Sequence, residues 1–344
     1  MKRWIKPLVA LLLVATLTVA TVVIQVNRFM TTPLSIAEAG LDFEIPAGSS
    51  FLSVTRGLIA AGVIDGDRWF QLYVRWTKQA SAIQAGEYLL ETGATPMSLL
   101  QQFTSGAVRL YAFTIVEGWT HRDLLRALHA HEAIAAELTE EDWPALLDSL
   151  GADVTHPEGL FLPETYRFAR NTSDAALLGQ AYELMQDVLA AAWQTRSGST
   201  VVDSAYEALV LASIVEKETA KADERSKIAG VFARRLQKRM RLQTDPTVIY
   251  GIGPGFNGNL TRKDLRTDTP YNTYTRHGLP PTPIAMPGRA AIIAALNPAD
   301  GTELYFVATG LGDGSHKFSE TKAQHDAAVA EYLRRLRLQR RTGS

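Results

Sequence analysis

The strongest pattern along the chain is an apolar run from Leu8 to Val26, interrupted only by three threonines and one glutamine. A helix of this length rises about 28 Å, close to the thickness of the hydrocarbon core of a bilayer. Lys2, Arg3 and Lys6 precede the run, so the positive-inside rule predicts a single-pass anchor with a cytoplasmic N-terminus. The alternative is a signal peptide cleaved after residues 18–20. We favour the anchor because the apolar run continues beyond that site.

Residues 41–110 show short periodic patterns that are typical of a compact mixed module, preceded by a juxtamembrane linker at 28–40. The patterns predict, in order, a strand at 43–46, helices at 49–60 and 69–76, a strand at 86–90 and a helix at 96–103. Small β-α-α-β arrangements of this kind are common binding modules, but the pattern does not identify a ligand.

Beyond residue 110 the pattern predicts a larger α+β domain. A capping box at Thr120 and Asp123 begins a short helix, and residues 157–168 are extended or turning because they hold two prolines and a glycine. The longest helical pattern runs from about Ala205 towards Lys238. The remaining predicted elements are a strand at 113–116, a helix from Asp245, as its N-cap, to near 251, a helix at 287–295, a strand at 304–308, a helix from about 320 and a frayed Arg-rich tail.

The predicted fold class is therefore α+β with an N-terminal transmembrane helix. The predicted division is a cytoplasmic stub and anchor at 1–27, a linker at 28–40, a small subdomain at 41–110, a larger domain at 111–335 and a basic tail at 336–344.

Composition excludes several classes of chemistry. The formal net charge is −1, so no basic excess favours nucleic acid. Cysteine is absent, which excludes disulfides, thiolate metal sites and a cysteine nucleophile. The histidines lack paired metal-ligand spacing, and the glycine-rich stretch at 251–258 lacks the lysine and hydroxyl of a phosphate loop. We therefore predict no metal and no cofactor.

The sharpest candidate for chemistry is Glu218. On a helix, Glu216 and Glu218 point about 200° apart, and Glu218 continues the apolar stripe that includes Leu211, Ile214 and Val215. A carboxyl on a core-facing stripe must be paired, protonated or lining a cleft. Desolvation there would raise its pKa, as a general acid working near neutral pH requires.

A structural alternative also explains Glu218, because a stripe glutamate can form an ion pair with Arg225 or Arg234 from a neighbouring element. The helix pattern alone favours this alternative. In the same region Glu216, Lys217, Glu224 and Arg225 are predicted to form a solvated face with exposed ion pairs.

Two further segments could contribute to a binding site. Asp245 follows Gln243-Thr244, although an N-cap role explains this aspartate fully. Tyr271-Asn272-Thr273-Tyr274 alternates aromatic rings with an amide, which suits a sugar, because ring faces stack on aromatics and hydroxyls need amide partners. Tyrosines are equally common as core residues.

Several ordered blocks of the sequence resemble the YceG-like family of endolytic murein transglycosylases. The similarity covers about residues 113–332, and the N-terminal anchor agrees with it. The blocks are Val116-Glu117-Gly118, Glu158-Gly159 through Thr165-Tyr166, the helix Leu211 to Thr219, the segment Arg241 to Gly251, Tyr271 to Tyr274 with Gly278 to Pro281, and Tyr305 to Ala308. Thr282 and Glu164 depart from the family's usual glycine and aspartate, which puts only loop detail in doubt.

The resemblance implies a LysM-like subdomain and a catalytic domain with local similarity to lysozyme-type transglycosylases. It assigns the catalytic role to Glu218. The motif residues that we predict to bind substrate are Gln243, Asp245, Tyr250, Tyr271, Asn272, Tyr274, Glu158 and Glu164. The implied reaction cleaves the bond between N-acetylmuramic acid (MurNAc) and N-acetylglucosamine (GlcNAc) in nascent peptidoglycan, with formation of a 1,6-anhydro ring and termination of strand elongation.

The implied location is the cell inner membrane, with the catalytic domain outside the cytoplasm. The implied partners are glycan strands, the membrane and peptidoglycan synthases. Two alternatives remain open. One is a hydrolysing muramidase that uses Asp245 or Glu164 as a second carboxylate. The other is a non-catalytic scaffold that binds peptidoglycan without releasing fragments.

Overall fold

The computed structural model describes residues 5–198 and 200–342, and the chain forms two compact units. Unit 1 comprises the chain up to Tyr111 together with Arg167–Asn171, and unit 2 comprises Ala112–Tyr166 and the chain from Thr172 onward. In the described residues, every sheet is a pair of strands and helices supply most of the core. The predicted α+β class is confirmed.

Helix α1 (Ile5–Thr31) contains the predicted apolar run and is, within the described residues, the one helix long and apolar enough to cross a membrane. Lys2 and Arg3 lie outside the described residues. The hydroxyls of Thr16, Thr18 and Thr21 donate to carbonyls one turn back, so these side chains need no water partner. Polar threonines are thus compatible with an apolar surrounding.

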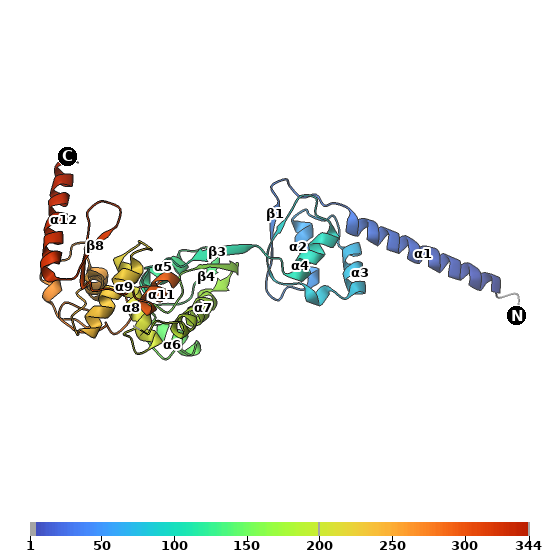
Figure 1. Cartoon of the computed structure of the whole chain (residues 1–344). Coiled ribbons are helices and arrows are strands. Elements are labelled where there is room, and N and C mark those ends of the chain that lie inside the picture. Colours follow the sequence, from blue (N-terminus) through green and yellow to red (C-terminus); the bar gives the residue numbers. More distant parts are fainter. Residues whose placement is uncertain (1–4, 199, 343–344) are drawn as a thin grey trace. The chain divides into compact units, whose positions relative to one another are not determined.

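Unit 1 is built around an antiparallel pair of strands, and its elements agree with the predicted order (Figure 1). The last turns of α1 join its core through the buried side chains of Val26 and Met30, and Ile36 from the predicted linker is buried there too. The elements after α1 are β1 (Leu41–Ile45), α2 (Phe51–Ala60), α3 (Arg68–Thr77), η1 (Ala80–Ala82), β2 (Gly86–Leu90) and α4 (Pro96–Ser105).

The first part of unit 2 consists of short elements. The predicted capping box is confirmed, because Thr120 Oγ1 accepts from the Asp123 N–H and the Asp123 carboxylate accepts from the Thr120 N–H. Strand β3 pairs with β5, and β4 with β6. The elements are β3 (Leu110–Thr114), α5 (His121–His129), β4 (Ile134–Ala135), α6 (Trp143–Ser149), β5 (Thr165–Ala169) and β6 (Thr172–Ser173). Residues 110–111 of β3 and 167–169 of β5 belong to unit 1.

The core of unit 2 is helical, with α11 packed against α7, α8 and α9. Every residue from 208 to 215 in α8 is buried, so this helix lies at the centre of the unit. The elements are α7 (Asp174–Gln194), α8 (Ala205–Glu218), α9 (Arg225–Gln237), α10 (Asp245–Ile252), η2 (Gly253–Gly255), η3 (Asp264–Arg266), α11 (Arg289–Leu296), β7 (Tyr305–Ala308), β8 (His316–Ser319) and α12 (Lys322–Thr342).

Three predictions about elements are wrong. The single helix from 205 towards 238 is two helices, because Thr219 adopts an extended conformation and ends α8 at Glu218. Asp245 is the first helical residue of α10 and Thr244 is the N-cap, since the Asp245 side chain bonds elsewhere. The Arg-rich end was predicted to be frayed, but it is helical, because α12 continues to Thr342. Residues 343–344 lie outside the described chain. For α7 no prediction was made.

Candidate active site

A cavity of about 410 Å³ opens in unit 2 beside the C-terminal end of α8. Its wall combines carboxylates, aromatic rings and an amide, the side chains that suit sugar rings and their hydroxyls. It is lined by Glu218, Phe232, Arg235, Leu242, Gln243, Asp245, Tyr274, the strand Tyr305–Ala308, His316, Lys322, His325 and Val329.

Glu218 is the last residue of α8, and the buried helix before it holds its backbone in place. The Thr244 hydroxyl donates a hydrogen bond to Glu218 Oε1. Burial is the main cause that raises the pKa of Glu218, and the nearby charge of Asp245 raises this pKa further. The hydrogen bond from Thr244 acts in the opposite direction and lowers it. The partial negative charge at a helix C-terminus also disfavours a carboxylate. Glu218 therefore holds its proton above the usual pH range of a glutamate.

The ion-pair alternative for Glu218 is wrong. Arg225 lies 3.6 Å from carboxylate oxygens of both Glu216 and Glu117, and Arg234 lies 3.2 Å from Glu303. Among the described residues, no arginine or lysine nitrogen lies within 4 Å of the Glu218 carboxylate. Glu218 is instead one of the residues that line the cavity.

The predicted solvated face is wrong for Glu216, for Glu224 and for Arg225, whose side chain is only 13% exposed. The side chain of Glu216 is only 6% exposed and accepts from the Gly288 N–H at 3.0 Å, and burial raises its pKa. Glu224 is buried and accepts from the His316 N–H at 3.0 Å, with its Oε2 2.7 Å from His316 Nδ1. The chain folds back after α8, so distant segments cover these carboxylates. Lys217 remains exposed.

The segment before α10 brings two predicted site residues into the cavity. Gln243 adopts a left-handed conformation with φ of 51°, and its N–H donates to the Thr273 carbonyl at 3.2 Å. The Tyr274 hydroxyl donates to Asp245 Oδ1 at 2.5 Å. Burial and this bond to Asp245 raise the pKa of Tyr274, which therefore stays protonated. Gln243, Asp245 and Tyr274 thus share the cavity with Glu218.

The other five predicted substrate-binding residues do not line this cavity. Glu158 is fully buried; it accepts from the His121 N–H at 3.0 Å and from the Tyr250 hydroxyl at 2.9 Å. The Asn272 amide donates to three backbone carbonyls of the segment 264–267, which contains η3. The Tyr271 hydroxyl lies 2.9 Å from Thr282 Oγ1, and Glu164 is exposed at the start of β5. Four of these side chains thus bond to other parts of the protein, away from this cavity: Glu158, Tyr250, Tyr271 and Asn272.

Several cavity residues were not predicted. His316 lies in the wall beside Glu218, and its positive charge when protonated lowers the pKa of Glu218. Arg235 donates to the carbonyls of Leu304 and Leu242, each at 2.6 Å, and so fixes one wall. Helix α12 adds Lys322 and His325. The sequence motif Tyr305–Ala308 could have indicated that the C-terminal segment belongs to the site, since all four of its residues line the cavity.

A larger cavity, of about 710 Å³, lies at the other end of α8. It is lined by Tyr206, Glu207 and Gly278–Pro281 among others, about 20 Å along the helix from Glu218. In the part of the chain that the structure describes, no group of three or more histidine, aspartate or glutamate side chains could hold a metal ion.

A carboxyl with a raised pKa in a cavity of aromatic and amide side chains defines a site of the kind found in enzymes that cleave glycosidic bonds by acid–base catalysis. The YceG-like family model matches residues 43–331, and the chain belongs to this family.

Relatives and a solved structure agree with this assignment. The chain is 34% identical over 313 residues to an endolytic murein transglycosylase of Bacillus subtilis, covering 85% of each. It is 30% identical to one of Streptococcus pneumoniae over 84% of this chain, but spans only 58% of that longer protein. A YceG-like protein of Listeria monocytogenes superposes with a TM-score of 0.52 at 29% identity, covering 85% of this chain and 99% of that one.

Proposed function

We propose that this protein is a peptidoglycan lytic transglycosylase that cuts glycan strands internally at the bond between MurNAc and GlcNAc. The observation that carries the proposal is Glu218, a carboxyl with a raised pKa at the wall of a cavity suited to sugars. The names of the relatives from Bacillus subtilis and Streptococcus pneumoniae support the same activity.

In the first step Glu218 donates its proton to the glycosidic oxygen, and the bond from that oxygen to C1 of MurNAc breaks. The Glu218 carboxylate then takes the proton from the C6 hydroxyl of MurNAc. The C6 oxygen forms a bond to C1 and closes a 1,6-anhydro ring. The carboxyl is regenerated and no water is consumed, so one carboxyl is sufficient.

A hydrolysing muramidase is the second candidate, and Asp245 is the observation that favours it. This carboxylate lines the same cavity and could activate water, as a second carboxylate does in ordinary glycosidases. Glu164 does not line the cavity. The hydrogen bond from Tyr274 to Asp245 supports a positioning role instead.

The surroundings of the site extend the proposal. Helix α1 supports an anchor in the cell inner membrane, and Lys6 at its start supports an orientation with the N-terminus inside. The strand–helix–helix–strand order of unit 1 supports a LysM-like module that holds glycan. A membrane-anchored transglycosylase that cleaves nascent strands would terminate their elongation and would act next to peptidoglycan synthases.

The test is mass spectrometry of products from purified glycan strands treated with the full-length protein. We expect internal fragments with 1,6-anhydro ends. Glu218→Gln should lower the rate at least about 1,000-fold, whereas the matched variant Glu216→Gln should stay within about tenfold, since Glu216 does not line the cavity. Hydrated reducing ends would refute the lyase in favour of the muramidase, and binding without any cleavage would favour a scaffold.

A further inference from the structure

Helix α3 in unit 1 carries an unusual exposed surface. Trp76 is 72% exposed and Leu72 is 42% exposed, with the partly buried Trp69 beside them. At about 100° per residue, these three side chains fall within roughly 60° of one another. Large aromatic side chains are seldom left this exposed in water. We call Trp69, Leu72 and Trp76 the apolar face of α3.

Cationic side chains border this apolar face. Arg68 and Arg75 lie about 20° apart around the helix and about 40–60° from Leu72, so they form one flank. Lys78 caps the helix in a left-handed conformation and is exposed. Neither Asp nor Glu occurs within α3 itself. Tryptophans flanked by arginines on one helix face, with a lysine at the end of the helix, are typical of an element that lies in a membrane interface.

The same helix packs against the end of α1 (Figure 1). The rings of Phe29 in α1 and Phe70 in α3 lie 6.4 Å apart, and Met30 and Val74 are both fully buried in the shared core. Because this contact lies within unit 1, it fixes α3 beside the helix expected to cross the bilayer.

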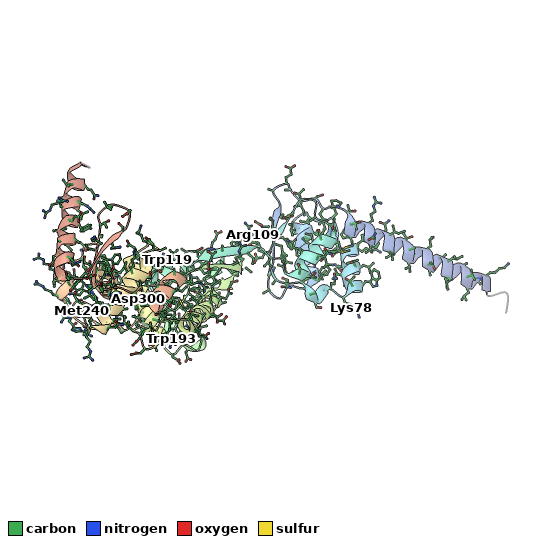
Figure 2. All side chains as sticks on the ribbon, in the orientation of Figure 1. Lys78, Arg109, Trp119, Trp193, Met240 and Asp300 are labelled. Carbon is green, nitrogen blue, oxygen red and sulfur yellow. The ribbon has the colours of Figure 1, made fainter. Side chains whose placement is uncertain are left out.

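The apolar span leaves no spacer between the bilayer and unit 1. From Lys6 to Gln25, the polar residues that bound the span, the helix rises about 28 Å, which already equals the hydrocarbon thickness. Val22 lies inside this span and nevertheless packs against the core of unit 1. Figure 2 shows Lys78 on the side of unit 1 from which α1 projects. The membrane boundary therefore falls at the level of α3.

We propose that the apolar face of α3 inserts into the interface of the bilayer that α1 crosses, with Arg68, Arg75 and Lys78 contacting lipid headgroups. The occupant is the lipid surface itself, because α3 adjoins the membrane-spanning helix. Unit 1 is then held flat against the membrane by two elements rather than tethered by one. This inference rests on the proposed anchoring role of α1.

Because the sequence contains no cysteine, a single introduced cysteine allows one fluorophore to be attached at a chosen position of the full-length protein. A fluorophore is placed on the apolar face by Trp76→Cys or Leu72→Cys. It is placed at an exposed position of β1 by Glu44→Cys, and in the middle of α1 by Val14→Cys. Each labelled protein is reconstituted into vesicles of phosphatidylcholine and phosphatidylglycerol with and without nitroxide-labelled lipid.

We expect nitroxide lipid to quench the labels at positions 14, 72 and 76 at least about twofold, and to leave the label at position 44 nearly unchanged. Quenching at position 14 with none at positions 72 and 76 would overturn the inference about α3 and leave the anchor intact. No quenching at position 14 would overturn the anchor itself, and the inference with it. None of these measurements depends on catalytic activity.

Discussion

The hydrogen bond from Thr244 to Glu218 offers a direct test of how the site sets the pKa of the proposed acid. Thr244 is 2% exposed, and its hydroxyl donates to the carboxylate. Thr244→Val removes the hydroxyl and keeps the side-chain shape. The other bonds of Thr244 use its backbone N–H and carbonyl, so they remain.

The magnitude follows from the type of bond. A hydrogen bond to a charged group contributes about 1.5–3 kcal/mol, and one pKa unit corresponds to about 1.4 kcal/mol. The bond stabilises the carboxylate and lowers the pKa of Glu218, so removing it should raise this pKa by about one to two units. Because the first step needs protonated Glu218, activity falls as pH rises through this pKa. The alkaline limb of the profile should therefore move upward.

The assay is the pH dependence of kcat/KM on purified glycan strands, with products quantified by mass spectrometry. Thr244→Ser keeps the donor and should reproduce the native profile. If Thr244→Val also leaves the alkaline limb in place, Glu218 is not the acid whose titration limits the reaction, and the reasoning from this hydrogen bond is refuted.

Four other substitutions have defined outcomes. Glu218→Gln should raise Tm by a few degrees at pH 8 but not at pH 4. The pKa of Glu218 is higher in the folded than in the unfolded protein, so the native protein loses stability as pH rises above the pKa of the unfolded state. Equal Tm values for the variant and the native protein at pH 8 would contradict a cost of burying the ionised carboxylate. Tyr250→Phe should lower the free energy of unfolding by about 1–3 kcal/mol in urea titration, since Glu158 loses a donor; a raised KM with unchanged stability would instead indicate sugar binding. Asp245→Asn should lower kcat more than tenfold and keep anhydro products, whereas Glu164→Gln should match the native rate.

The sequence was sufficient wherever structure depends on neighbours along the chain. The apolar run of α1, the strands and helices of unit 1, and the capping box at Thr120 are local features, and each lies where its pattern predicted. The motif around Glu218 also identified the family, because several ordered blocks together are specific. For these features periodicity and capping chemistry carry the information.

Tertiary structure decided the environment of Glu218. A periodic pattern shows which residues face a core, but it does not show which distant segment supplies their partners. The pattern therefore does not show that α8 ends at Glu218, that Thr244 bonds to this carboxyl, or that His316 lines the same cavity. Nor does it show that the segment at Gly288 covers Glu216. Burial and hydrogen bonding set a carboxyl's pKa, and both depend on residues far apart in sequence. The sequence pointed to Glu218 as the candidate acid through its family motif, whereas the pKa of this carboxyl is a property of the fold.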